Sequence, residues 1–270
     1  MVRRSHLVCY SYYAVDESGL TKTPIWAAEK LTASSVDAAR EMKRLNAFHE
    51  DTSVDSDEEA SLRDYVHSGY DRGHNVPSGD APDAKAQYET FSLLNMSPQN
   101  SDNNRHLWEG IESKVRDLAE QVKEVYVVTG PVFIGPATYI NARVEVPTYL
   151  WKAVYVPGLG AGAYITRNAP GNDFAVVSIS QLKEITHIDP FPSIAEAMAS
   201  HAMDLPSPGL KSRRKANQVA LADLGLTVGN ASASGAGTHV WLSTLYQGKA
   251  ATDARNSVKR ALHNLGVSQP

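Results

Sequence analysis

The sequence has only one cysteine, Cys9, and no long apolar run. A single thiol forms no intrachain disulfide and builds no cysteine metal cage. No stretch approaches the roughly 18 apolar residues that a membrane-spanning helix needs. The 270 residues are 42% apolar, which suffices to bury a core without such support. Residues 5–15 are too polar for a secretory signal core, which leaves a cytosolic protein or a processed mature form as alternatives.

An overall excess of positive charge is also lacking, since the net charge is −4. The charges are unevenly placed: residues 50–59 hold six acids, whereas residues 206–270 hold eight Lys or Arg against two Asp. We therefore expect a first domain over 1–205 and a basic C-terminal extension over 206–270. Within this extension, the Gly/Ser/Ala composition of residues 229–237 is typical of a linker, and the spacing of apolar residues over 252–265 predicts a terminal amphipathic helix. Charge alone leaves two roles open, a packed extension or a second grip on nucleic acid.

The spacing of apolar residues predicts a mixed α+β domain. Apolar residues recur at helical spacing over 105–124. Short β-branched and aromatic runs predict strands, and two later stretches predict short helices. The expected strands are 7–14, 65–72, 88–95, 125–128, 131–134, 144–156, 163–166 and 175–179, and the short helices are 180–188 and 193–201. We expect a mainly antiparallel central sheet with flanking helices, and a long surface loop over 32–60.

The segment Tyr70-Asp-Arg-Gly-His74 combines groups suited to phosphate chemistry. Histidine accepts a proton near neutral pH, so His74 is a candidate general base. Arg72 offers a planar cation that fits phosphate oxygens. Gly73 allows a tight turn and the close approach of a polymer. A lone loop histidine is usually a plain surface residue, so the interpretation depends on a partner elsewhere.

That partner is the helix that follows, where Asn104, Glu112 and Arg116 share one stripe. Asn104 and Glu112 are eight residues apart, which is roughly 12 Å of helical rise. Direct magnesium bonds are only about 2.0–2.1 Å long, so both side chains do not bind one ion directly. We assign Asn104 as the direct ligand and Glu112 to metal-bound water. The alternative for Glu112 and Arg116 is a surface ion pair at i,i+4.

These motifs resemble the DNA/RNA non-specific endonucleases of the ββα-metal (His-Me finger) class, which includes secreted bacterial nucleases and mitochondrial endonuclease G. The match rests on four ordered motifs: Asp71-Arg-Gly-His74, Asn95-Met-Ser-Pro-Gln99, the helix from Asn104 through Trp108 to Glu112, and the stretch 125–133. The resemblance covers about residues 8–205 and implies a ββα-metal active-site motif.

The resemblance implies magnesium-dependent cleavage of DNA and RNA with little sequence preference and 5′-phosphate products. His74 would deprotonate the attacking water, Asn104 would hold magnesium (or manganese in its place), and Glu112 would orient metal waters. Arg72 and Arg116 would steady phosphate charge, with Asp71 and Gly73 at the substrate. An early family arginine is replaced here by Lys22, which keeps the charge but loses bidentate recognition.

Other functions remain open at this stage. The metal helix would equally serve a phosphodiesterase acting on small phosphate esters. A non-enzymatic nucleic-acid-binding module and a toxin or effector are further alternatives. The resemblance favours a secreted or periplasmic protein over a cytoplasmic one. It also suggests a homodimer. The toxin or effector alternative would bring an inhibitor or immunity protein as a partner, and the lack of a long apolar run predicts no membrane association.

Overall fold

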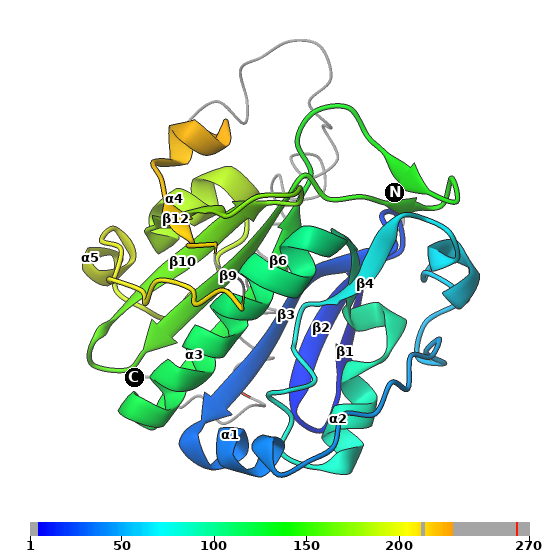
Figure 1. The fold of residues 1–270 in the computed structure, drawn as a ribbon, viewed down its shortest axis with the longest axis horizontal. Helices are drawn as coiled ribbons and strands as arrows, with labels where there is room; N and C mark the ends of the chain where they lie inside the picture. The colour runs from blue at the N-terminus through cyan, green and yellow to red at the C-terminus, as the bar shows by residue number, and fades with distance from the viewer. Residues whose placement is uncertain (1–4, 212–213, 229–262, 264–270) are drawn as a thin grey trace.

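The computed structural model describes residues 5–211, 214–228 and 263. One eight-stranded sheet crosses it in the order β1-β2-β3-β6-β9-β10-β11-β12 (Figure 1). All neighbouring strands are antiparallel except β11 and β12, which are parallel. Its strands are β1 Ser5–Cys9, β2 Tyr13–Ser18, β3 Thr23–Thr32, β6 Glu124–Val132, β9 Tyr149–Val156, β10 Gly160–Arg167, β11 Asp173–Val177 and β12 Asn217–Gln218. The expected mixed, mainly antiparallel α+β fold is confirmed.

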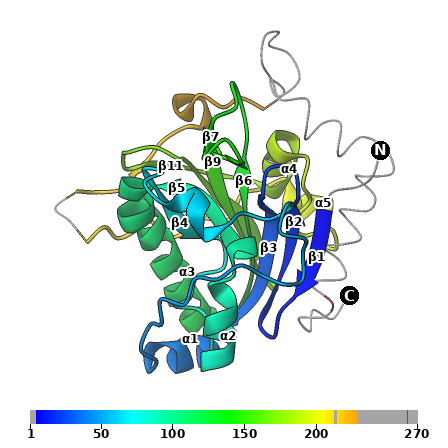
Figure 2. The same ribbon diagram turned by 90° about the vertical axis from the view of Figure 1, so that its right-hand side faces the viewer.

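Both faces of this sheet are covered (Figure 2). On one face lie α1 Ala33–Arg40, α2 Ala84–Thr90 and α3 Glu109–Val122, and on the other lie α4 Ile179–Thr186 and α5 Glu196–Ala199. Each face has its own apolar core: Ile111 and Val115 of α3 pack on the first, and Leu182 and Ile185 of α4 on the second. Because both faces are buried, the central strands are apolar nearly throughout rather than alternating.

A small hairpin on the α3 side forms the ββα motif. Strand β4 Tyr70–His74 pairs antiparallel with β5 Met96–Asn100. The chain then enters a π-helical turn, η3 Asn103–Trp108, that continues directly into α3. The amphipathic spacing over 105–124 thus predicted this helix correctly. A π-helical turn is rare and is often found at functional sites, and this one carries Asn104.

The remaining elements are short and lie mostly outside the main sheet. Besides the elements given above, the described residues form the strands β7 Tyr139–Ile140 and β8 Val144–Glu145, which pair with each other, and the 3₁₀ turns η1 Leu62–Tyr65, η2 Leu93–Asn95 and η4 Leu221–Leu224. The expected strand over 144–156 is therefore split into β8 and β9. The expected loop over 32–60 begins with the two-turn helix α1, which Thr32 caps by accepting from the Ser35 amide.

The bounds of several expected strands were wrong. Of the strand expected over 65–72, only residues 70–72 lie in a strand, because the chain forms the 3₁₀ turn η1 up to Tyr65, and β4 continues through Gly73 to His74. The 7–14 stretch is a hairpin rather than one strand, because the chain reverses between β1 and β2. The Tyr10 amide donates to the Tyr13 carbonyl at 2.8 Å across this turn. The 88–95 stretch is the end of α2 followed by η2, since Asp83 caps α2 by accepting from the Ala86 amide at 2.9 Å. Residues 125–128 and 131–134 belong largely to one continuous strand, β6, in which Gly130 pairs with Trp151 instead of turning.

The first part of the basic extension packs onto the sheet and α3. Strand β12 adds to the sheet edge, and Leu224 and Leu226 are buried in the core beside α4. The backbone carbonyl of Leu224 accepts from the Tyr149 hydroxyl at 2.8 Å. The boundary at 205 stays a prediction, and the expected linker at 229–237 and helix at 252–265 lie outside the described residues, apart from His263. Among the described helices, none has the length and apolarity to cross a bilayer.

Candidate active site

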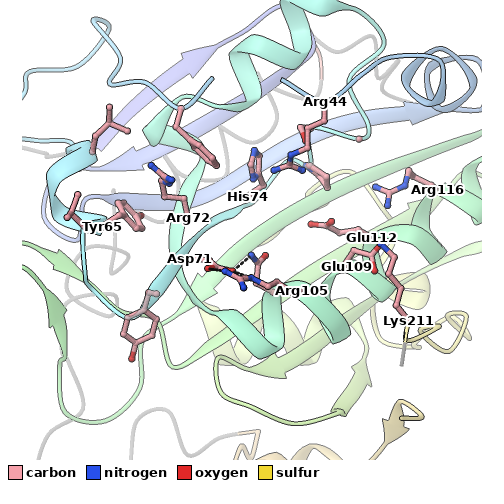
Figure 3. A pocket seen from close by; sticks show the side chains of 18 residues that line it. Arg44, Tyr65, Asp71, Arg72, His74, Arg105, Glu109, Glu112, Arg116 and Lys211 are labelled. Carbon is pink, nitrogen blue, oxygen red and sulfur yellow. Dashed lines mark hydrogen bonds and ion pairs between the residues drawn. The ribbon is translucent and has the colours of Figure 1, made fainter. Parts of the chain in front are cut away.

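A pocket of about 620 Å³ opens between the β4–β5 hairpin and the start of α3. Six of the eight residues expected at the site line it: Asp71, Arg72, His74, Asn104, Glu112 and Arg116. The other lining residues come from the 44–66 segment, from Tyr70 and the 77–79 loop, from η3 and α3, and from the C-terminal extension. Figure 3 shows Arg44, Glu112 and Arg116 extending into the same space on one side of His74, with Arg72 on the other.

His74 packs against two aromatic rings, Phe48 and Phe91, that also contact each other. Its ring centroid is 5.0 Å from that of Phe91, edge to face, and 5.6 Å from that of Phe48. Burial, together with the positive charges of Arg44 and Arg72, lowers the pKa of His74 to about 3. Its Nε2 is buried and has no hydrogen-bond partner among the described residues. A neutral histidine with an unused ring nitrogen has a site at which it can accept a proton.

Asp71 determines how Asn104 is oriented. The Asn104 amide nitrogen donates to Asp71 Oδ2 at 2.9 Å, which leaves the amide oxygen as its remaining polar group. Arg105 grips the same carboxylate through Nε at 2.9 Å and Nη2 at 2.7 Å. Asp71 is therefore bound by protein side chains on both oxygens. This arrangement fits a positioning role for Asp71 better than direct contact with substrate.

Glu112 and Arg116 both face the pocket, one turn apart on α3. Burial raises the pKa of Glu112 to about 7, while Lys152 and Arg116 oppose this shift. The Arg116 guanidinium donates to Asp80 Oδ1 at 2.6 Å, and the Asp80 side chain is only 3% exposed. Arg116 is thus held by a carboxylate of the 75–84 loop rather than by the i,i+4 pair considered from the sequence. This buried pairing fixes a cation at the pocket wall.

These groups fit a magnesium ion better than a transition metal. The described residues contain no cluster of three or more His, Cys, Asp or Glu side chains that would hold a metal. The pocket offers one amide oxygen on Asn104 and the carboxyl group of Glu112, since its other two carboxylates, Asp71 and Glu109, are held by Arg105 and Lys211. Magnesium keeps several of its waters and accepts such sparse oxygen ligation. Zinc, by contrast, is usually bound by three or four nitrogen or sulfur ligands.

The last two expected site residues lie away from the pocket lining. Gly73 is buried, and a side chain there would collide with Gln99, since an added Cβ would lie 2.6 Å from the Gln99 Cβ. Its lack of a side chain thus serves the close pairing of β4 with β5. The Lys22 ammonium donates to the Asp57 carbonyl. Burial raises the pKa of Glu17 well above its usual value, and the charge of Lys22 opposes that rise only in part.

The sequence did not single out several residues that shape the pocket. Arg44 and Phe48 come from the expected surface loop, where no periodicity points to them. The Arg72 guanidinium stacks over the Phe48 ring at 4.1 Å from its centroid, so this loop helps to orient a predicted site residue. Lys211 comes from the extension, and its lysine-arginine cluster was the one available signal.

A family model described as DNA/RNA non-specific endonuclease matches residues 2–197. A nuclease of Syncephalastrum racemosum is 38% identical over 169 residues, which are 62% of this chain and 50% of that protein. A nuclease of Nostoc sp. is 32% identical over 204 residues, 68% of this chain and 73% of that protein. The mitochondrial nuclease EXOG of Danio rerio is 32% identical over 179 residues, 60% of this chain and 52% of that protein. The chain therefore spans only about half of two of these relatives.

The fold is also found in a solved structure. The crystal structure of the EndoG/EndoGI complex, which concerns the mechanism of EndoG inhibition, matches with a TM-score of 0.64 and 28% sequence identity. The match covers 72% of this chain and 88% of that one.

Proposed function

Because the chain belongs to the DNA/RNA non-specific endonuclease family, we propose that it is a magnesium-dependent endonuclease that hydrolyses DNA and RNA. The observation that carries the proposal is the shared pocket of His74 and Asn104. A neutral histidine with an unpartnered Nε2 lines the same cavity as an amide whose nitrogen is already bound. A base for water and an oxygen ligand for a hard cation are two parts that metal-assisted phosphodiester hydrolysis uses.

In this mechanism the protein's own residues bind the phosphate, orient the metal ligand and deprotonate the attacking water. Arg72 and Arg116 bind the phosphate oxygens on the two sides of His74. His74 takes a proton from the water that attacks phosphorus. The bond between phosphorus and the 3′-oxygen breaks, and that oxygen takes up a proton from solvent water, which gives one 3′-hydroxyl end and one 5′-phosphate end. When bound at the Asn104 oxygen, magnesium supplies positive charge beside the phosphate. Glu112 accepts hydrogen bonds from water next to that position, and Asp71 keeps Asn104 turned toward it.

The described part of the pocket has no element shaped to read base edges in a duplex groove, which agrees with cleavage of little sequence preference. Lys22 is retained as a candidate substrate contact for a strand that extends beyond the pocket. Relatives that include a mitochondrial nuclease are consistent with action away from the cell's own genome. We propose a secreted or periplasmic site of action. We also propose an inhibitor protein as a partner, as in the EndoG/EndoGI complex, and a homodimer.

The test is incubation of the wild type and His74→Ala with supercoiled plasmid and with RNA, in magnesium and in chelator. We expect only the wild type in magnesium to degrade both, with products that ligase joins without prior phosphorylation. An aryl phosphate diester serves as the comparison substrate. Rapid turnover of the ester with intact plasmid would support the small-ester phosphodiesterase instead. Metal-independent cleavage that survives His74→Ala would refute the assignment.

A further inference from the structure

The C-terminal extension reaches the pocket although it lies beyond the family match, which ends at residue 197. The stretch from Pro206 to Lys211 runs beside α3. The Tyr164 hydroxyl donates to the Pro206 carbonyl at 2.7 Å, which anchors its start. Farther along, Gly110 of α3 faces Gly209 so closely that an added Cβ on Gly110 would lie 2.6 Å from the Gly209 carbonyl oxygen. The path of this backbone is therefore set by direct packing.

Because of this packing, the Lys211 ammonium lies at the rim of the pocket. Lys211 lines the pocket, and its Nζ lies 2.7 Å from Glu109 Oε1 (Figure 3). The Lys211 side chain is 74% exposed, whereas that of Glu109 is 29% exposed. An ammonium has three donors, so the contact with Glu109 leaves donors directed to the open side. Glu109 thus holds a solvent-facing cation beside the site.

We propose that Lys211 binds a phosphate of the nucleic-acid strand next to the scissile phosphate, so that the extension forms part of the substrate site. This inference rests on the proposed nuclease function. Arg44, Arg72 and Arg116 supply cations within the pocket, and Lys211 continues that series outward along α3. A strand carries a phosphate at every nucleotide, so a cation at the rim meets the next charge along the chain.

The geometry of the extension supports a fixed rather than a chance contact. Beyond Lys211, Arg214 binds both oxygens of Asp102 with its Nη1, at 2.8 and 3.1 Å. Asp102 immediately precedes the π-helical turn that carries Asn104. The extension is consequently tied to the helix that carries the site on both sides of Lys211, by backbone packing at Gly209 and by this ion pair.

The experiment measures binding without cleavage. In a full-length His74→Ala parent, the affinity for a fluorescent DNA duplex is measured by anisotropy over a range of NaCl at constant magnesium. Adding Lys211→Gln should weaken binding on the order of three- to ten-fold at physiological salt. The slope of log affinity against log salt should become shallower by about 0.9, the value for one lost phosphate contact. Lys183→Gln is the matched control. Lys183 also pairs with an acid, Asp189, at 3.0 Å, but it lies on α4, on the opposite face of the sheet.

A second parent protein, which carries both His74→Ala and Glu109→Gln, tests whether Lys211 binds phosphate or only cancels the negative charge of Glu109. If Lys211 contacts phosphate, Lys211→Gln also weakens binding when Glu109→Gln is present. If Lys211→Gln has no effect in that background, Lys211 only masks the Glu109 charge and the proposal is overturned. An unchanged salt slope in a parent that binds DNA overturns this contact alone. A parent that binds no nucleic acid overturns the proposed function and this contact with it.

Discussion

The Asn104 amide nitrogen donates to Asp71 Oδ2 at 2.9 Å, and this bond links the β4 strand to the π-helical turn. Asn104 and Asp71 are 33 positions apart, yet the hairpin and helix of the ββα motif place them in contact. Without this hydrogen bond the Asn104 amide is free to rotate. Either its oxygen or its nitrogen could then point to the proposed metal position, and only the oxygen can bind magnesium. The orientation of the proposed metal ligand therefore depends on a residue that itself binds no metal.

Asp71→Ala should weaken magnesium binding by about 10- to 100-fold, as is typical for loss of a group that orients a ligand. The measurement is the magnesium concentration for half-maximal cleavage of plasmid. Arg105→Ala is the matched control, since it removes the other partner of Asp71 and leaves the Asn104 contact in place. Equal magnesium requirements in Asp71→Ala and the wild type would show that Asn104 needs no such support.

Glu112 should make the magnesium requirement depend on pH. Burial raises its pKa to about 7 in the absence of metal, so the carboxyl group holds a proton below that value and is ionised above it. Magnesium favours the ionised form and must displace this proton at lower pH. We expect the half-maximal magnesium concentration to rise up to about ten-fold per unit of pH below 7 and to level off above it.

The measurement is a magnesium titration of initial rates at several pH values on both sides of the Glu112 pKa. In Glu112→Gln the side chain has no proton to lose, so its residual activity should show a magnesium requirement independent of this step. A wild-type requirement that stays constant across the range would mean that Glu112 does not face the metal.

His74 should remain neutral far below the pH at which histidine usually titrates. Burial lowers its pKa to about 3, and Arg44 and Arg72 add repulsion of the protonated ring. Because a nearby positive charge disfavours the protonated form, Arg44→Gln should raise this pKa toward the ordinary value near 6.5. The measurement is a pH titration of the ring nitrogens by NMR in the magnesium-free protein, with His74→Ala to identify the signal. Titration of wild-type His74 near 6.5 would contradict the buried environment described here.

The helix and the motif that carries His74 could be predicted from the sequence for a physical reason. The apolar positions of α3 recur at helical spacing, and the Asp71-to-His74 motif is contiguous, so both are local signals. Arg44 and Phe48 were missed because they approach His74 only through tertiary packing of an aperiodic segment. Lys211 lies 99 positions from Glu112, and nothing local indicates that the extension turns back along α3. Short strands were misplaced where a capping residue such as Asp83 outweighed an apolar run.

Glu17 gives a prediction about stability that is separate from catalysis. Its side chain is fully buried in β2, and neither carboxylate oxygen has a hydrogen-bond partner among the described residues. Burial raises its pKa well above the usual value, and the charges of Glu59 and Asp16 add to the shift. Burial raises the pKa of Glu59 to about 7 as well. The negative charge of an ionised Glu59 therefore makes ionisation of Glu17 still less favourable.

A folded-state pKa above the unfolded one means that the folded protein binds more protons. Stability is therefore greatest below the unfolded value, near 4.3, and is lost as pH rises toward the folded pKa, by up to about 1.4 kcal/mol per unit for this group. Glu17→Gln removes the charge, so its free energy of unfolding should exceed that of the wild type at alkaline pH, and the difference should shrink toward acid pH. Urea unfolding at several pH values measures this, with the exposed Glu184→Gln as control. If Glu17→Gln were less stable by the same amount at every pH, the carboxylate would have to be satisfied in the folded state by a partner that the described residues do not supply.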